Sequence, residues 1–234
     1  MKYLRLWDKF TVLLFALYLS GCEPVNDPLE DNSEPPALPT VTFKSLPDTT
    51  HLEAKYTQST IDAMNGFSFA YFSTFINVTP TKTQDGFTWT RTLQNLTIRL
   101  VAAKQLNEGY TWKIIYNGSD SQGRTYNNWT LLDGTTTVDS KNATWIVYED
   151  NTTVKTADFE WSTSSTGVLT GTFKLYTGSA VATQIVLTSN PDNSGELKLY
   201  DGTVIVYRSL WQANGSGQWW RYDSSGQITS SGSW

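Results

Sequence analysis

The sequence is poor in the residues from which metal sites and redox chemistry are usually built. Its 234 residues include one cysteine, Cys22, and one histidine, His51. A single cysteine excludes an internal disulfide framework and any cysteine-rich metal site. A single histidine argues against zinc sites built from several histidines and against histidine-based proton relays. We therefore expect no bound metal and no cofactor.

Charge is also scarce, and positive charge is scarcer than negative. Charged residues make up 17% of the chain, with 17 Lys and Arg against 22 Asp and Glu, and the isoelectric point is near 4.9. Nucleic-acid binding needs a basic surface, so we do not expect a nucleic-acid partner. Phosphate-binding glycine loops, a Gly-x-Ser-x-Gly elbow and a His-Glu-x-x-His helix are all missing from the sequence. The prediction is that the protein is not an enzyme.

Long hydrophobic runs are missing too. The apolar run FTVLLFALYL (residues 10–19) is too short to cross a membrane as a mature helix. It follows a basic start (residues 2–9) and runs into Leu19-Ser20-Gly21-Cys22. This tetrapeptide resembles the bacterial lipoprotein signal, which is an aliphatic residue, a small residue, Gly or Ala, and then Cys. The resemblance implies a signal peptide over residues 1–21, cleavage before Cys22 and acyl chains such as palmitate on Cys22.

The alternative is an ordinary secretory signal with an incidental cysteine, but a lipid-modified Cys22 accounts better for a thiol that has no partner. Two or three acyl chains anchor a protein firmly, at about 0.8 kcal/mol per buried methylene. Among enteric lipoproteins, an Asp directly after the cysteine favours the inner membrane; this chain has Glu23. We therefore expect a cell-envelope protein held by lipid, in the outer membrane, with the periplasmic and surface leaflets both open.

An acidic, proline-rich segment follows the cysteine. Residues 23–39 contain five prolines and no Lys or Arg. Proline stiffness and like-charge repulsion favour an extended chain without a core. We assign residues 22–45 to a tether and residues 46–234 to a single folded domain.

The folded part has one ambiguous segment and a long run of strand patterns. Residues 57–78 have apolar residues at helical spacing, with Ser59 or Thr60 as a cap, but their aromatic residues also alternate as in a strand. We favour a helix. Beyond Gly86, short alternating segments are separated by Gly, Asn and Asp turns, which predicts about ten sequential antiparallel strands. The expected fold is mainly β, a single up-and-down meander forming an open curved sheet or half-barrel, preceded by one helix.

A weak internal repeat supports the meander. Residues 194–202 and 216–224 share the pattern Ser-Gly, four residues, Tyr-Asp. Alternation also predicts two different faces of the sheet. One face carries apolar side chains such as Trp145 and Val147, whereas the other carries polar ones such as Glu196 and Lys198.

Two family resemblances bear on the body of the chain. A helix before a long meander is similar in outline to the half-barrel of the periplasmic lipoprotein carrier and its outer-membrane receptor, which hold acyl chains in an apolar hollow. The tryptophan-rich ending GQWWRYDSSGQITSSGSW looks more like uncharacterised lipoproteins of Bacteroidota, a likeness that implies no activity. An integral outer-membrane barrel, suggested by the final Trp234, is disfavoured because these strands are short and their second face is polar.

Few residues stand out as candidates for chemistry. Asp158 and Glu160 share one strand face, as carboxylates of some glycosidases do, but a solvated strand face explains them better. Asp192, Asn193 and Glu196 lack the spacing of a calcium loop, and a hairpin turn is the better account. Arg221 occupies an apolar position of its strand, where it either neutralises a buried carboxylate or lies at an exposed rim. We expect the rim.

The surplus of aromatic side chains suggests one further candidate. Trp219, Trp220 and Tyr222 form a possible exposed patch for ligand binding. We expect a non-enzymatic, lipid-anchored domain displayed for binding or envelope structure, with a glycan, lipid or envelope protein as partner. One alternative is a half-barrel that binds lipid or another apolar ligand. A second is a carbohydrate-binding or carbohydrate-active surface module.

Overall fold

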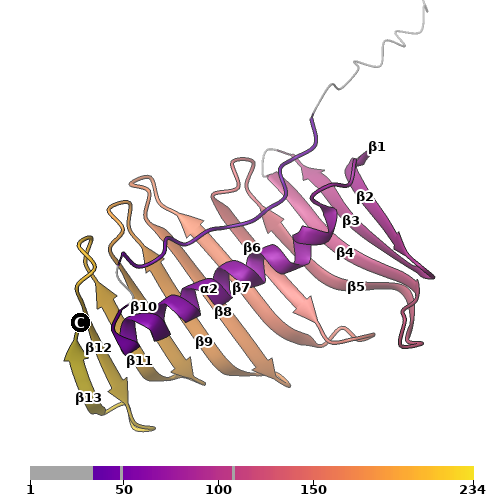
Figure 1. The fold of residues 1–234 in the computed structure, drawn as a ribbon. Coiled ribbons are helices and arrows are strands. Elements are labelled where there is room, and N and C mark those ends of the chain that lie inside the picture. Colours follow the sequence, from indigo (N-terminus) through magenta and orange to yellow (C-terminus); the bar gives the residue numbers. More distant parts are fainter. Residues whose placement is uncertain (1–33, 48–49, 107–108) are drawn as a thin grey trace, which may run out of the picture. The chain divides into compact units, whose positions relative to one another are not determined.

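Short turns between neighbouring strands determine the topology. A computed structural model describes residues 34–47, 50–106 and 109–234 of the chain. Its strands lie in one sheet in sequence order, and every neighbouring pair is antiparallel (Figure 1). The strands are β1 (Thr81–Thr83), β2 (Gly86–Leu93), β3 (Leu96–Gln105), β4 (Gly109–Ser119), β5 (Thr125–Thr136), β6 (Asn142–Tyr148), β7 (Lys155–Thr163), β8 (Leu169–Thr177), β9 (Ala180–Ser189), β10 (Gly195–Asp201), β11 (Val204–Trp211), β12 (Gly217–Tyr222) and β13 (Ile228–Ser233).

The predicted antiparallel meander is confirmed, and the sheet is open. The predicted number of about ten strands is too low, because the sheet has 13. Strand β1 has only three residues, too few to show an alternating pattern. Strands β8 and β9 are separated by only two residues, 178 and 179, so their patterns run together in the sequence.

The helix predicted over residues 57–78 is present, but its bounds differ. Helix α2 runs over Leu52–Phe72 and continues as the short 3-10 helix η1 over Ser73–Phe75. The cap is His51, whose Nδ1 accepts a hydrogen bond from the Glu53 backbone N–H at 3.3 Å. Ser59 and Thr60, the expected caps, lie inside the helix and donate their hydroxyls to carbonyls four residues earlier.

Helix α2 crosses one face of the sheet. Its buried residues recur every three or four positions, including Ala54, Ile61, Met64 and Phe72, which gives the helix one apolar side. Near its start, the Thr57 hydroxyl hydrogen-bonds Ser209 of β11. Near its end, Phe72 packs against Trp112 of β4 and Trp145 of β6. The helix therefore spans most of the meander (Figure 1).

An extended segment, here called the strap (residues 35–47), lies beside the helix on the same face (Figure 1). It belongs to the compact unit formed by residues 35–234, although its composition had placed most of it in the tether. Side chains of α2 bind its backbone. Asn65 accepts from the Phe43 N–H at 2.8 Å and donates to the Phe43 carbonyl at 3.0 Å, and Ser68 accepts from the Val41 N–H at 3.0 Å.

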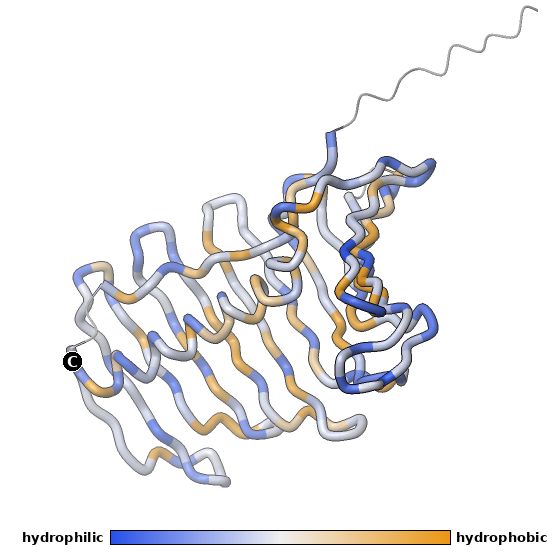
Figure 2. The backbone as a smooth tube through the Cα atoms, turned by 45° about the vertical axis from the view of Figure 1, so that its right-hand side comes forward, coloured by the Kyte–Doolittle hydropathy of each residue, from blue (hydrophilic) through white to orange (hydrophobic). Residues whose placement is uncertain are grey.

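The sheet therefore has two different faces, as the alternation predicts. The covered face packs against α2 and the strap, and it buries side chains such as Trp112, Trp145, Phe159 and Leu187. The opposite face, here called the bare face, carries the intervening residues of each strand, and β3 shows strict alternation of buried and partly exposed positions. Colouring by hydropathy shows the same alternation along many strands (Figure 2). Within the described ranges, no helix has both the length and the apolar character needed to cross a membrane.

Candidate functional site

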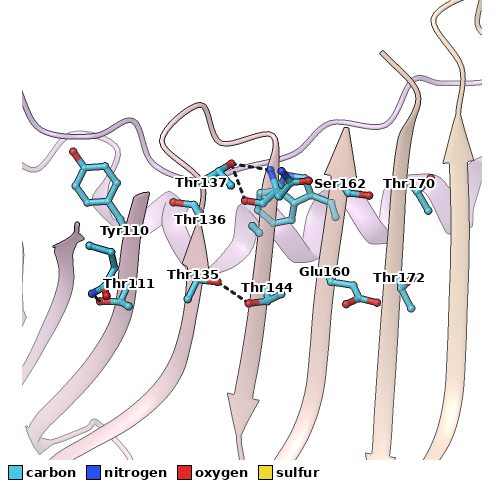
Figure 3. A pocket seen from close by; sticks show the side chains of 14 residues that line it. Tyr110, Thr111, Thr135, Thr136, Thr137, Thr144, Glu160, Ser162, Thr170 and Thr172 are labelled. Carbon is cyan, nitrogen blue, oxygen red and sulfur yellow. Dashed lines mark hydrogen bonds between the residues drawn. The ribbon is translucent and has the colours of Figure 1, made fainter. Parts of the chain in front are cut away.

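Strand register places a row of polar side chains across the bare face. Five residues from neighbouring strands β4 to β8 lie directly opposite one another: Thr111, Thr135, Thr144, Glu160 and Thr172. Neighbouring strands are about 4.8 Å apart, so the row repeats at that interval. The close view shows four of these side chains, Thr135 to Thr172, at one level across successive strands (Figure 3).

A groove of about 530 Å³ follows this row. Seven of its fourteen lining residues are threonines, and Ser162 and Thr170, which are paired across β7 and β8, form a second row beside the first (Figure 3). Four of the lining residues, Tyr110, Thr136, Ala143 and Trp161, belong by register to the covered side of the same strands. Among the fourteen lining residues there is one carboxylate, Glu160, and no Lys or Arg. The volume of the groove lies within the range of about 300–1,000 Å³ that small-molecule sites occupy.

The two halves of the groove differ in how their polar groups are satisfied. On the β4–β6 side, the Thr135 and Thr144 hydroxyls bond each other at 2.9 Å. On the covered side of the same strands, the Thr136 hydroxyl accepts from the Trp112 indole N–H at 2.9 Å. On the β7–β8 side, the side chains of Glu160, Ser162, Thr170 and Thr172 have no hydrogen-bond or ion-pair partner among the described residues. This half of the groove therefore has open donors and acceptors.

Asp158, two residues before Glu160, is in a different situation. Both carboxylates lie on the bare face, as the alternation predicts. The Asp158 carboxylate accepts from Lys155 Nζ at 2.8 Å and from the Tyr176 hydroxyl at 2.6 Å. Hydrogen bonds to Asp158 and Tyr176 raise the pKa of Lys155 above its usual value. The hydrogen-bonding capacity of the Asp158 carboxylate is therefore taken up by Lys155 and Tyr176, and Asp158 does not line the groove.

The other carboxylates of the bare face are paired as well. Glu196 accepts from Lys198 Nζ at 2.8 Å and from Arg208 Nε at 2.7 Å. Although burial opposes the change, these hydrogen bonds lower the pKa of Glu196. Asp133 accepts from the Tyr148 hydroxyl at 3.1 Å. Glu160 is thus the one bare-face carboxylate of β5–β11 without a described partner.

Asp192 and Asn193, two of the residues considered for calcium, lie in a hairpin turn as expected, whereas Glu196 lies on strand β10. Asp192 accepts from the backbone and the hydroxyl of Ser194, and the Asn193 N–H donates to the Asn190 carbonyl. Hydrogen bonds from Ser194 lower the pKa of Asp192. Over the described residues, no group of three or more His, Cys, Asp and Glu is placed to hold a metal ion.

The proposed aromatic patch is divided between the two faces of the sheet. Trp219 lies on the covered face, opposite Ser209, and packs against the core. Trp220 lies on the bare face, where the Arg208 guanidinium sits 5.2 Å from the centre of its ring. Tyr222, two residues further, shares the side of Trp220 by alternation and is partly exposed.

Arg221 neutralises a buried carboxylate, which is the alternative to the expected rim position. Its Nη2 lies 3.0 and 3.1 Å from the two carboxylate oxygens of Glu53, whose side chain is 8% exposed. The Arg221 side chain itself is 47% exposed, so it also lies at a rim. The pair ties the first turn of α2 to β12.

The threonine-lined groove was not predicted. The alternation of Thr170 and Thr172 in β8 puts them on one face, but only the register of five strands brings them beside Glu160. The lipoprotein signal Leu19-Ser20-Gly21-Cys22 lies outside the described residues. No protein-family model matches the chain, and a comparison with curated proteins finds no similar sequence.

Proposed function

We propose that the chain is a lipid-anchored protein of the bacterial cell envelope whose β domain is not an enzyme and presents its bare face to a binding partner. One observation carries the binding role. Helix α2 and the strap cover one face of the sheet, whereas the opposite face holds a groove with unpartnered polar side chains. The sequence supports the anchor, because Leu19-Ser20-Gly21-Cys22 resembles the lipoprotein signal. The proposed location is the outer membrane.

The covered face gives no support to a half-barrel that holds an apolar ligand. The space between α2, the strap and the sheet contains large side chains that are at most 2% exposed, including Phe43, Phe72, Trp112, Trp145 and Phe159. Several of these rings touch one another, for example Phe72 with Trp145 at 5.1 Å between ring centres. Side chains therefore occupy the place where such a carrier would need its hollow.

The anchor is tested by labelling cells with a palmitate analogue. Wild-type protein is expected to take up the label and to fractionate with membranes, whereas the Cys22→Ser variant is expected to do neither. Equal labelling of the two proteins would contradict the proposed anchor.

The display of the bare face is tested with a photoreactive amino acid in cells of the source organism. We place it at Gln184, which lies on the bare face opposite Lys174 and outside the groove, or at Ser59, which is exposed on the outer side of α2. Adducts are expected from position 184 and not from position 59. Adducts from position 59 alone, or from neither position, would count against binding through the bare face.

A further inference from the structure

We propose that the groove around Glu160 binds a neutral carbohydrate, with the Glu160 carboxylate and the hydroxyls of Thr172, Thr170 and Ser162 as its hydrogen-bonding partners. This inference rests on the proposed function, because it names the class of ligand that the bare face would bind. It places the carbohydrate on strands β4–β8, away from the aromatic residues near the C-terminus that the sequence suggested.

The chemistry of the lining favours a ligand rich in hydroxyl groups. An ionised carboxylate only accepts hydrogen bonds, whereas threonine and serine hydroxyls both donate and accept. A sugar offers several hydroxyls that also do both, so two of them can donate to Glu160 while others pair with the threonines. Hydrogen bonds to a charged group are stronger than those between neutral groups. The open side chains of β7 and β8 therefore match a polyol better than an apolar ligand.

The charge of the groove favours a neutral ligand over an anionic one. Binding a phosphate, sulfate or carboxylate normally requires Arg, Lys or a set of backbone N–H groups. No Arg or Lys lines the groove, and Glu160 contributes a negative charge without a described partner. A bound cation is less well supported, because a single exposed carboxylate gains little from an ion pair. Uncharged sugars remain the best match.

The shape of the groove favours an oligosaccharide over a single sugar. Polar side chains repeat at about 4.8 Å from β4 to β8. An extended ligand lying across the strands would therefore meet a new hydroxyl or carboxylate at each strand. Three apolar residues also line the groove, Tyr110, Ala143 and Trp161, but register puts them on the covered side of the same strands, so the contacts that the bare face offers a ligand are polar.

The test measures binding of neutral tetrasaccharides to the full-length protein in detergent micelles by calorimetry. The probes are cellotetraose, laminaritetraose, maltotetraose, xylotetraose and mannotetraose, with spermidine as a cationic probe. At least one tetrasaccharide is expected to bind. Glu160→Gln is expected to weaken that binding about 10- to 100-fold, and Thr172→Val about 2- to 10-fold. Both residues lie at the surface of the sheet, so both variants are expected to fold.

Two matched variants serve as controls. Glu149→Gln removes an exposed carboxylate from a turn, and Thr97→Val removes a bare-face hydroxyl of β3, and neither residue lines the groove. Both are expected to bind like the wild type. The inference is overturned if no tetrasaccharide binds at millimolar concentration, if Glu160→Gln and Thr172→Val bind as well as the controls, or if spermidine alone binds. The proposed function has its own tests. Equal palmitate labelling of wild type and Cys22→Ser, or the absence of cross-links from position 184, would contradict it whatever the outcome of the sugar-binding measurements.

Discussion

At the residue scale, glycines stand opposite five tryptophans of the covered face. Register gives six such cross-strand pairs: Trp112 with Gly134, Trp145 with Gly134, Trp161 with Gly171, Trp211 with Gly195, Trp211 with Gly217, and Trp219 with Gly232. A Cβ added at Gly195 would lie 2.2 Å from Cζ2 of Trp211. The indole therefore needs the space that the glycine leaves. This also explains the sequence repeat, because its two glycines, Gly195 and Gly217, flank one tryptophan.

Gly195→Ala is expected to destabilise the domain. The new methyl group would overlap the Trp211 ring and would lie 2.4 Å from the backbone oxygen of Thr188, which cannot easily move. Overpacking of this kind costs about 1–3 kcal/mol. The change is measured as a lower free energy of unfolding in urea.

Gly66→Ala is the matched control for this substitution. Gly66 lies inside α2 with no atom near the position of an added Cβ, so alanine is expected to stabilise the protein by about 0.5–1 kcal/mol. If both substitutions had the same effect on unfolding, close packing of Trp211 on glycine would not explain why the internal repeat has glycine at residues 195 and 217.

Single residues also show what sequence patterns can and cannot predict. Alternation places Asp158 and Glu160 on one face and Trp219 and Trp220 on opposite faces. It does not reveal that Asp158 is paired and Glu160 is not, because the Tyr176 partner comes from the next strand. The ion pair of Arg221 with Glu53 joins residues 168 positions apart. Only the position of α2 on the sheet brings these two side chains together.

At the element scale, side chains of helix α2 hydrogen-bond the backbone of the strap, as a neighbouring strand would do in a sheet. The strap makes side-chain-to-backbone bonds with Ser68, Asn65 and Gln58 of α2, and the last of these accepts from the Leu46 N–H at 2.7 Å. Phe43 of the strap lies over Gly171 of β8, where an added Cβ would be 2.3 Å from its ring. The strap is thus held by helix and sheet together.

Asn65→Ala is expected to loosen the strap without unfolding the sheet. Asn65 makes both of its hydrogen bonds to the backbone of Phe43, and losing them leaves a partly buried N–H and carbonyl unpaired. The expected loss is about 1–3 kcal/mol in the free energy that protects the Phe43 amide, measured by hydrogen exchange. Ser59→Ala, on the outer side of α2, is the control. Unchanged protection of Phe43 in Asn65→Ala would show that the amide of Asn65 does not hold the strap.

The hairpins, helix α2 and the strap show which element boundaries could be predicted from the sequence. Turn residues marked most hairpins correctly, because Gly, Asn and Asp accept the backbone angles that tight turns need, as at Gly202 with φ of 57°. The start of α2 was missed because histidine is an uncommon cap, whereas Ser59 and Thr60 are typical ones. The strap was missed because its prolines and the acidic residues just before it indicate a tether, whereas its apolar residues Val41, Phe43 and Leu46 are buried.

At the scale of the compact unit formed by residues 35–234, each strand pairs with its neighbours in the sequence, and α2 and the strap are the described elements that join distant strands. Such a chain of nearest-neighbour contacts is expected to open locally where nothing bridges it. Strand β13 is exposed along its whole length, whereas β7 alternates buried residues under α2. Strand β7 is therefore stabilised by packing against α2, whereas β13 is held by its pairing with β12.

Hydrogen exchange in mild denaturant should show this difference. Amides of β13 are expected to exchange through low-energy local openings, and amides of β7 only near the free energy of global unfolding. The measurement is exchange resolved by peptide or by residue across a urea series. Equal opening energies in the two strands would mean that the sheet unfolds as one unit and does not depend on α2 for its cooperativity.

The strap also has a mechanical consequence. Any force that reaches the domain through the chain before residue 35 arrives first at the strap. The contacts that resist it there are the hydrogen bonds between the strap backbone and the side chains of Ser68, Asn65 and Gln58, together with the ring of Phe43 on β8, not the backbone ladder of the sheet. We therefore expect a pulled domain to release its strap at low load, lengthening the molecule while the thirteen strands stay paired.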